Sequence, residues 1–180
     1  MIENVNTKKA AIKKSNGCLT AVIIAILLAL GFMLYAMIDF RNMVNKTWKS
    51  FDDERITQVE KYFDMTMPDD VTPVKFNRQS APGDGSSLCR LIVEGISEPE
   101  DFLSEAFPDV KIKECTTDDE QFSHIKNTLD DDSGYMEYSV EFTEIFERVY
   151  ADNPNDEYYI GFGKTDNGYC AVIRYFNSEI

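Results

Sequence analysis

An uncharged apolar run near the N-terminus constrains this chain more than any other feature. Residues 18–38 read CLTAVIIAILLALGFMLYAMI and contain no charged side chain in 21 positions. As an α-helix, which rises about 1.5 Å per residue, the run is about 31 Å long and matches a hydrocarbon core of about 30 Å. Eleven positions are Leu, Ile, Val or Phe, and together they favour insertion by about 3 to 6 kcal/mol. We predict a transmembrane helix over residues 18–38, stopped by Asp39 and Arg41.

A cleaved signal peptide is the main alternative to a permanent span. The lysine-rich start fits one, and Ala29-Leu30-Gly31 resembles a small-residue cleavage site. The apolar run continues to Ile38, however, which makes it longer than the usual apolar region of about 7–15 residues. We therefore expect the segment to stay in place as a signal-anchor.

The orientation of the span depends on the basic residues beside it. Four precede the run and four follow it closely, namely Lys8, Lys9, Lys13, Lys14, Arg41, Lys46, Lys49 and Arg55. A short lysine-rich tail is costly to translocate, whereas a long domain crosses largely regardless of its charge. We expect residues 1–17 to form a cytoplasmic basic tail and the C-terminal domain to lie outside the cytoplasm at the cell membrane.

Small residues recur every four positions along the run, at Gly17, Ala21, Ala25 and Ala29. This spacing places them on one helix face, where small side chains allow a second membrane helix to approach closely. The alternative is chance, because alanine is common in membrane helices. These four residues are our candidates for helix packing, either in self-association or with a protein partner.

The rest of the chain is strongly acidic. After residue 44 it carries 13 basic and 30 acidic side chains, a net charge of −17. Such a domain repels phosphate backbones, so we expect no nucleic acid partner. It is also repelled by anionic lipid headgroups, which should hold it off the bilayer. Of the chain's 12 Phe and 9 Tyr, all but Phe32, Tyr35 and Phe40 lie in this part, which is enough large apolar material for a core.

The pattern after the span predicts an α+β fold. Residues 39–66 contain a helical segment, ERITQVEKYF, and are expected to form a juxtamembrane helical stalk that ends before Pro68. Residues 67–180 are expected to form an acidic α+β domain, a mainly antiparallel sheet with two or three helices on one face. The predicted strands are 71–80, 88–95, 110–115, 135–142, 157–163 and 169–176, and the predicted helices are 97–107 and 118–129. Pro73 suggests that the first strand lies at a sheet edge.

Cysteine and histidine usage does not indicate a metal site. The four cysteines are Cys18, Cys89, Cys115 and Cys170, and none are spaced as a C-x-x-C pair. With a single histidine, His124, the chain lacks a zinc-binding pattern. One disulfide within the domain and ordinary buried thiols both remain open, because Cys89 and Cys170 lie in apolar strand patterns.

Catalytic and cofactor motifs do not rise above background. The Asp130-Asp131-Asp132 run resembles a calcium loop, but the sixth position, which requires glycine, holds Tyr135. We therefore expect a solvated acidic turn there. We assign no catalytic, cofactor-binding or metal-ligating residue and expect no cofactor.

Three functions fit this pattern. The first is a single-pass membrane protein whose exported acidic domain binds a protein or an envelope component and is not an enzyme. The second is a membrane-tethered hydrolase that uses carboxylates, and the third is a regulatory subunit that acts through its transmembrane helix. The partner that the sequence predicts directly is the lipid bilayer.

Overall fold

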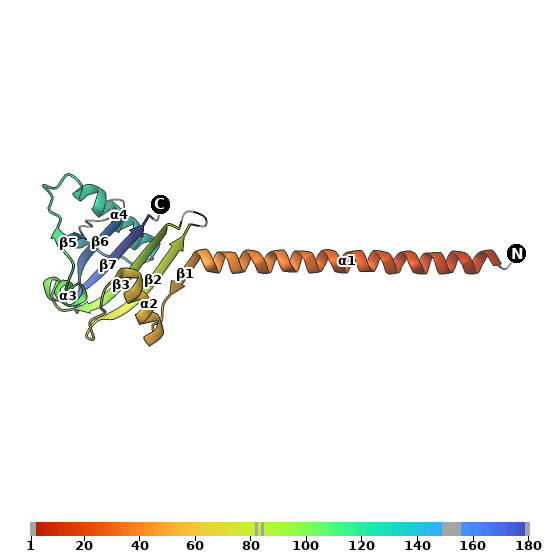
Figure 1. The fold of residues 1–180 in the computed structure, drawn as a ribbon, viewed down its shortest axis with the longest axis horizontal. Coiled ribbons are helices and arrows are strands. Elements are labelled where there is room, and N and C mark those ends of the chain that lie inside the picture. The colour runs from red at the N-terminus through yellow and green to blue at the C-terminus, as the bar shows by residue number, and fades with distance from the viewer. Residues whose placement is uncertain (1–2, 82, 84, 149–155, 179–180) are drawn as a thin grey trace. The chain divides into compact units, whose positions relative to one another are not determined.

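The chain divides into two compact units. The computed structural model describes residues 3–81, 83, 85–148 and 156–178 (Figure 1). The first unit is Met1–Met43 and the second is Val44–Ile180.

The first unit consists of one long helix, α1 (Glu3–Val44), whose last residue, Val44, already belongs to the second unit. Within it, Leu19–Arg41 is long and apolar enough to cross a membrane, judged by length and composition. None of the most apolar stretch is buried against the rest of the protein. The prediction of one N-terminal apolar helix over residues 18–38 is therefore confirmed. The apolar segment ends three residues later than predicted, at Arg41, and the helix itself continues beyond the segment at both ends.

The second unit is built on one antiparallel sheet of seven strands in the order β1-β2-β3-β7-β6-β5-β4. The strands are β1 (Asn45–Trp48), β2 (Thr72–Ser80), β3 (Ser87–Ile96), β4 (Ile112–Glu114), β5 (Phe142–Arg148), β6 (Glu157–Thr165) and β7 (Gly168–Asn177). The predicted α+β class is confirmed. Two hairpins read from the sequence are also confirmed, β2 with β3 and β6 with β7. Each joins two runs of β-branched and aromatic residues across a short turn segment.

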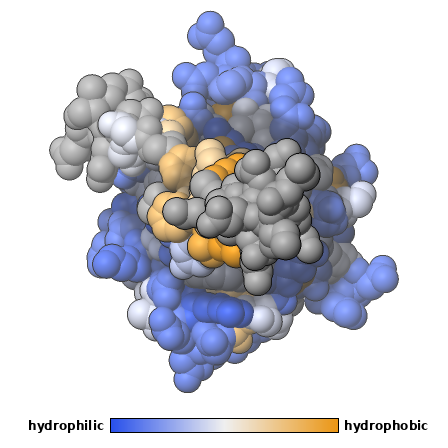
Figure 2. All heavy atoms as spheres, turned by 90° about the vertical axis from the view of Figure 1, so that its right-hand side faces the viewer, coloured by the Kyte–Doolittle hydropathy of each residue, from blue (hydrophilic) through white to orange (hydrophobic). Residues whose placement is uncertain are grey.

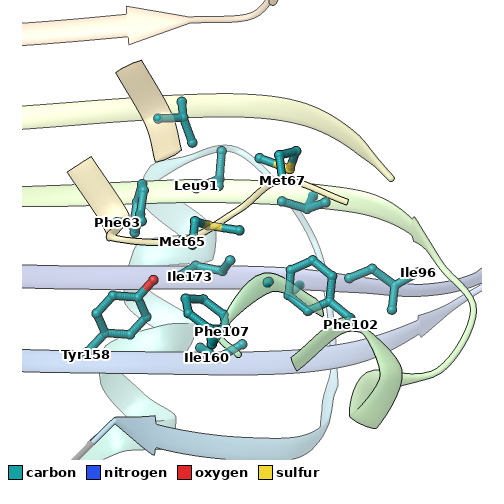
Figure 3. Close-up of a cluster of buried hydrophobic side chains, with 14 of the residues drawn as sticks. Phe63, Met65, Met67, Leu91, Ile96, Phe102, Phe107, Tyr158, Ile160 and Ile173 are labelled. Carbon is teal, nitrogen blue, oxygen red and sulfur yellow. The ribbon is translucent and has the colours of Figure 1, made fainter. Parts of the chain in front are cut away.

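Three helices pack on this sheet, and they occupy both of its faces. They are α2 (Asp53–Phe63), α3 (Pro99–Ala106) and α4 (Phe122–Tyr135). The first core cluster joins α2 and α3 to one face of the sheet, and Figure 3 shows Phe63 and Phe102 reaching into it from these two helices. The second cluster joins α4 to the other face through Ile125 and Leu129. The expectation that the helices lie on one face was wrong. The spacing of apolar residues in a helix shows which side of the helix is buried, but it does not show which face of the sheet that side packs against.

The segment predicted to be a helical stalk, residues 39–66, is also corrected. Asn45 to Trp48 form β1, which pairs with β2 from Gln79 to Phe76. The α2 helix begins as expected, with the Asp52 side chain accepting a hydrogen bond from Arg55 N at 2.9 Å. Val59 and Phe63 of α2, however, are fully buried in the core. Both elements therefore belong to the α+β unit.

The position of Pro73 fits the sheet without making β2 an edge strand. Strand β1 lies outside β2 but pairs with it only from Phe76 onward. Pro73 therefore lies in the part of β2 that β1 does not cover, next to a register shift between Pro73 and Lys75. A residue without a backbone N–H is tolerated at such a position.

The segment around residues 118–142 differs most from its prediction. The helix begins later than expected, because Asp119 holds a turn by accepting hydrogen bonds from Thr116 N and from Lys113 Nζ. Helix α4 then continues to Tyr135, where a strand over 135–142 was predicted. The alternating residues Met136, Tyr138, Val140 and Phe142 do all contact the second cluster. The first three lie in an irregular segment, and Phe142 is the first residue of β5. The alternation of apolar residues therefore indicated which side chains are buried, but it did not indicate a strand.

Two glycines of the unit give opposite predictions on substitution by alanine. A methyl group at Gly163 in β6 would lie 2.7 Å from the carbonyl oxygen of Glu141 and would overlap Val140 Cγ2. We expect Gly163→Ala to destabilise the fold by about 1–3 kcal/mol through overpacking. Gly134 in α4 has open space around its Cα, so Gly134→Ala should stabilise it by about 0.5–1 kcal/mol. Urea unfolding of the two variants checks both signs, and a loss of stability in Gly134→Ala would contradict the assignment of α4.

Candidate functional site

A polar row crosses the sheet on the face that α4 covers. Directly opposed residues of neighbouring strands share a face, and the pairing places one polar residue of each strand in a continuous line. The polar row consists of Thr47, Asn77, Arg90, Arg174, Tyr159, Glu147 and Lys113. It interrupts a face that is otherwise apolar at its centre, so each buried member requires a polar partner.

Helix α4 supplies the central partner, Asp132. One of its carboxylate oxygens accepts a hydrogen bond from Arg90 Nε, and the other accepts from Arg174 Nη1 at 2.8 Å. The Asp132 side chain is 4% exposed, and those of Arg90 and Arg174 are 9% and 14% exposed. Arg174 also donates to Glu157 at 3.3 Å. Two guanidinium groups on adjacent strands therefore hold one carboxylate of the helix.

Neutral side chains complete the surroundings of Arg90. Its Nη1 donates to Asn77 Oδ1 at 3.1 Å and to Gln79 Oε1 at 3.3 Å. The ring of Tyr135 lies 4.5 Å from Arg90 Cζ, and its hydroxyl accepts from Gln79 Nε2 at 2.8 Å. Asn77 in turn donates to Asn45 Oδ1 at 2.7 Å. The network thus links β1, β2 and β3 to the C-terminal turn of α4.

This arrangement fixes the position of α4 and leaves little capacity for chemistry. Both carboxylate oxygens of Asp132 are engaged, and each arginine is held in a charge-assisted hydrogen bond. Removing one partner of such a buried group is costly, because the remaining charges have no compensation. We assign the Arg90–Asp132–Arg174 group a structural role.

The three cysteines of the unit are free and buried. Burial raises the pKa of the Cys89 thiol to about 11, against the opposing effect of Arg78 and Arg90. Burial likewise raises the pKa of the Cys115 thiol to about 11, and the Glu147 carboxylate adds to the rise. Burial also raises the pKa of Cys170. Since the thiolate is the reactive form, none of these thiols is activated as a nucleophile.

We expect these three thiols to be unreactive in the folded protein. Their raised pKa values keep them protonated at pH 8, and their side chains are 2%, 5% and 1% exposed for Cys89, Cys115 and Cys170. In a Cys18→Ser variant, Ellman's reagent at pH 8 should detect no fast-reacting thiol before denaturation and three after it. Rapid modification of one thiol in the native protein would contradict the burial.

A second polar group, half-buried, joins the segment after α4 to the sheet. The Tyr138 hydroxyl donates to Glu94 Oε1 at 2.6 Å, and Cys170 Sγ donates to the Gly163 carbonyl at 3.4 Å. Burial raises the pKa of Tyr138, and the hydrogen bond that its hydroxyl donates to the Glu94 carboxylate raises it further. The phenol is therefore neutral across the physiological range and serves as a hydrogen-bond donor.

The residues singled out from the sequence do not converge on one place. Ala21, Ala25 and Ala29 lie exposed on α1, and Gly17 lies on the same helix. Their use as a helix-packing face stays a prediction. His124 is exposed on α4. Among the residues that the structure describes, no group of three His, Cys, Asp or Glu side chains could hold a metal ion.

Asp132 is the residue that sequence reasoning placed wrongly. The run Asp130-Asp131-Asp132 was expected to be a solvated acidic turn, but it lies inside α4 with Asp132 buried. A signal was available in the strands, since Arg90 and Arg174 each interrupt an apolar run. A buried arginine requires a carboxylate partner, but the sequence does not show which one.

The second unit carries several surface grooves, and some of them are acidic. One of about 190 Å3 lies beside the start of α3 and includes Asp70, Glu98, Asp101 and Glu105 in its lining. Another of about 430 Å3 lies beside Arg148, between the C-terminal ends of α2 and α3.

No family model, curated protein or solved structure matches this chain.

Proposed function

We propose that this chain is a single-pass membrane protein whose acidic α+β unit lies outside the cytoplasm and binds a protein or an envelope component. The unit acts by binding and not by catalysis. The observation that carries the proposal is the exposed apolar helix Leu19–Arg41, which is followed within three residues by a folded unit.

The contrast between the two units supports the membrane anchor. The apolar side chains of α1, such as Leu28 and Phe32, are 70% and 72% exposed. By contrast, most of the described surface visible in Figure 2 is hydrophilic. An exposed apolar surface on this scale requires a partner, and a bilayer matches it in length and composition.

The buried ionisable groups of the second unit support binding over catalysis. Asp132 holds two arginines, Tyr138 donates to Glu94, and the cysteines are protonated. The groups that could act as base or nucleophile in the interior are thus committed to structural contacts. What the surface offers instead is a set of grooves and a strong negative charge.

Thiol labelling in intact cells tests the anchor and its orientation. In a Cys18→Ser background, Ser123→Cys places a thiol on an exposed position of α4. Ser15→Cys places one in the N-terminal tail as its matched control. We expect a membrane-impermeant maleimide to label Ser123→Cys in intact cells and to label Ser15→Cys only after permeabilisation. The reverse pattern would place the acidic unit in the cytoplasm and overturn this part of the proposal.

Binding is tested by crosslinking from the same exported position. A photoreactive maleimide on Ser123→Cys should give a discrete crosslinked species in cells. A parallel variant with Ala21, Ala25 and Ala29 changed to Leu separates the alternatives. Loss of the species in this variant would indicate that the association runs through the membrane helix and not through the acidic unit.

A further inference from the structure

A groove without charged residues lies at one end of the sheet. It has a volume of about 430 Å3, and its lining includes Val44, Gln79, Ala81, Ser87, Leu88 and Phe176. Val44 is the last residue of α1, directly before β1, and the other residues lie at or just beyond the neighbouring ends of β2, β3 and β7. We call it the strand-end groove.

The strand-end groove differs in charge from the rest of the unit. None of its nine lining residues is charged, although the unit carries a net charge of −17. Three other grooves contain two or more carboxylates each, for example Asp70 and Asp101, Asp64 and Asp109, or Asp130 and Glu137. The lining of this groove therefore presents no carboxylate of its own to an anionic headgroup.

Apolar side chains remain uncovered at this end. Leu88 and Phe176 are half-buried and belong to neither core cluster. Nearby, Tyr135 bonds to Gln79 and is 49% exposed. It is the one large apolar side chain outside α1 that counts as exposed in the described part of the chain. Tyrosine is enriched where a protein meets the lipid headgroups.

The covalent chain keeps this groove close to the end of the span. Val44 lines the groove and follows Arg41, the last residue of the apolar helix, by three positions. Even a fully extended chain of that length reaches only about 10 Å. One lining residue of the groove, Val44, therefore lies within that distance of Arg41, where the apolar segment ends.

We infer that the strand-end groove is a lipid-contacting surface that takes the headgroup and glycerol region of a phospholipid bilayer. This inference rests on the membrane anchoring proposed above. Contact at this end holds the sheet against the bilayer, and the acidic grooves are left for the aqueous side.

Fluorescence quenching in vesicles tests the inference on the full chain. The Ala81→Cys variant in a Cys18→Ser background carries an NBD label at the rim of the groove. The vesicles are phosphatidylcholine with a nitroxide lipid labelled near the headgroup. We expect the label to lose more than half of its emission. The matched control is Ser97→Cys, an exposed position just beyond the opposite end of β3, and its emission should not change.

A further variant distinguishes direct contact between the groove and the bilayer from a label that only lies close to the bilayer. Leu88→Glu places a charge in the groove and should restore the emission of the Ala81 label, with Trp48 emission reporting an intact fold. Quenching that persists in Leu88→Glu, or equal quenching at both label positions, would overturn the inference. A disulfide-linked dimer of unlabelled Ala81→Cys would show that a second copy covers the groove instead.

Carbonate extraction of the same vesicles distinguishes failure of the membrane anchor from failure of the groove contact. Release of the protein at high pH would contradict the anchor itself. Retention of the protein together with an unquenched Ala81 label would contradict the groove contact alone.

Discussion

Replacing Asp132 by asparagine should be among the most destabilising single changes in this protein. The substitution leaves the guanidinium groups of Arg90 and Arg174 buried without their shared counter-charge. Breaking a buried charge pair by removing one partner costs about 3–5 kcal/mol. Urea unfolding of the full chain in detergent micelles, followed by the emission of its single tryptophan, Trp48, measures this loss.

Asp131 is the matched control for this experiment. It is the neighbouring residue of α4, is exposed, and has the same side chain. Asp131→Asn should change the free energy of unfolding by less than about 0.5 kcal/mol, as is usual for surface positions. Equal effects of the two variants would show that Asp132 does not hold the arginines in solution.

Truncating Phe63 should have an effect of similar size for a different reason. Phe63 is fully buried, and its ring packs edge-on against Phe76 at 6.2 Å and against Tyr158 at 6.1 Å. The Phe63→Ala variant removes these contacts and leaves a cavity between α2 and the sheet. Substitutions of this kind cost about 3–5 kcal/mol, and the same unfolding experiment measures the loss.

This second prediction also tests where the α+β unit begins. If residues 39–66 formed a stalk outside the domain, Phe63→Ala would cost less than about 0.5 kcal/mol. Phe122→Ala, at a half-buried position of α4, should cost less than Phe63→Ala and serves as the comparison. A Phe63 effect below that of Phe122 would remove α2 from the core.

Local patterns were sufficient for the elements whose neighbours lie close in sequence. The apolar run appeared in the structure as part of α1, and the β6–β7 hairpin formed around a turn at Asp166 and Asn167. In both cases the signal and its structural cause lie within the same few residues. The start of α2 at Asp52 is a further example, because its cap is a contact between residues three positions apart.

Patterns failed where the deciding contact is distant in sequence. Strand β1 has only four residues and exists because β2, about thirty positions later, pairs with it. The alternation after Tyr135 indicated which side chains are buried but not the irregular path that buries them. The three aspartates from Asp130 gave no sign that only the last of them faces two arginines.

By itself, the sequence determined that the chain has one apolar helix of membrane length and an acidic α+β unit with two sheet hairpins. These properties follow from composition and from short-range periodicity, which need no knowledge of the rest of the chain. Only the tertiary structure decided that β1 and α2 belong to the sheet unit, that the helices cover both faces, and that Asp132 of α4 is buried against Arg90 and Arg174. It also showed that a groove free of charge lies within three residues of the apolar helix. The reason is physical. Strand order decides which face of the sheet an apolar helix side packs against, and it decides which carboxylate lies next to a buried arginine. Strand order itself is set by contacts between residues that are distant in sequence.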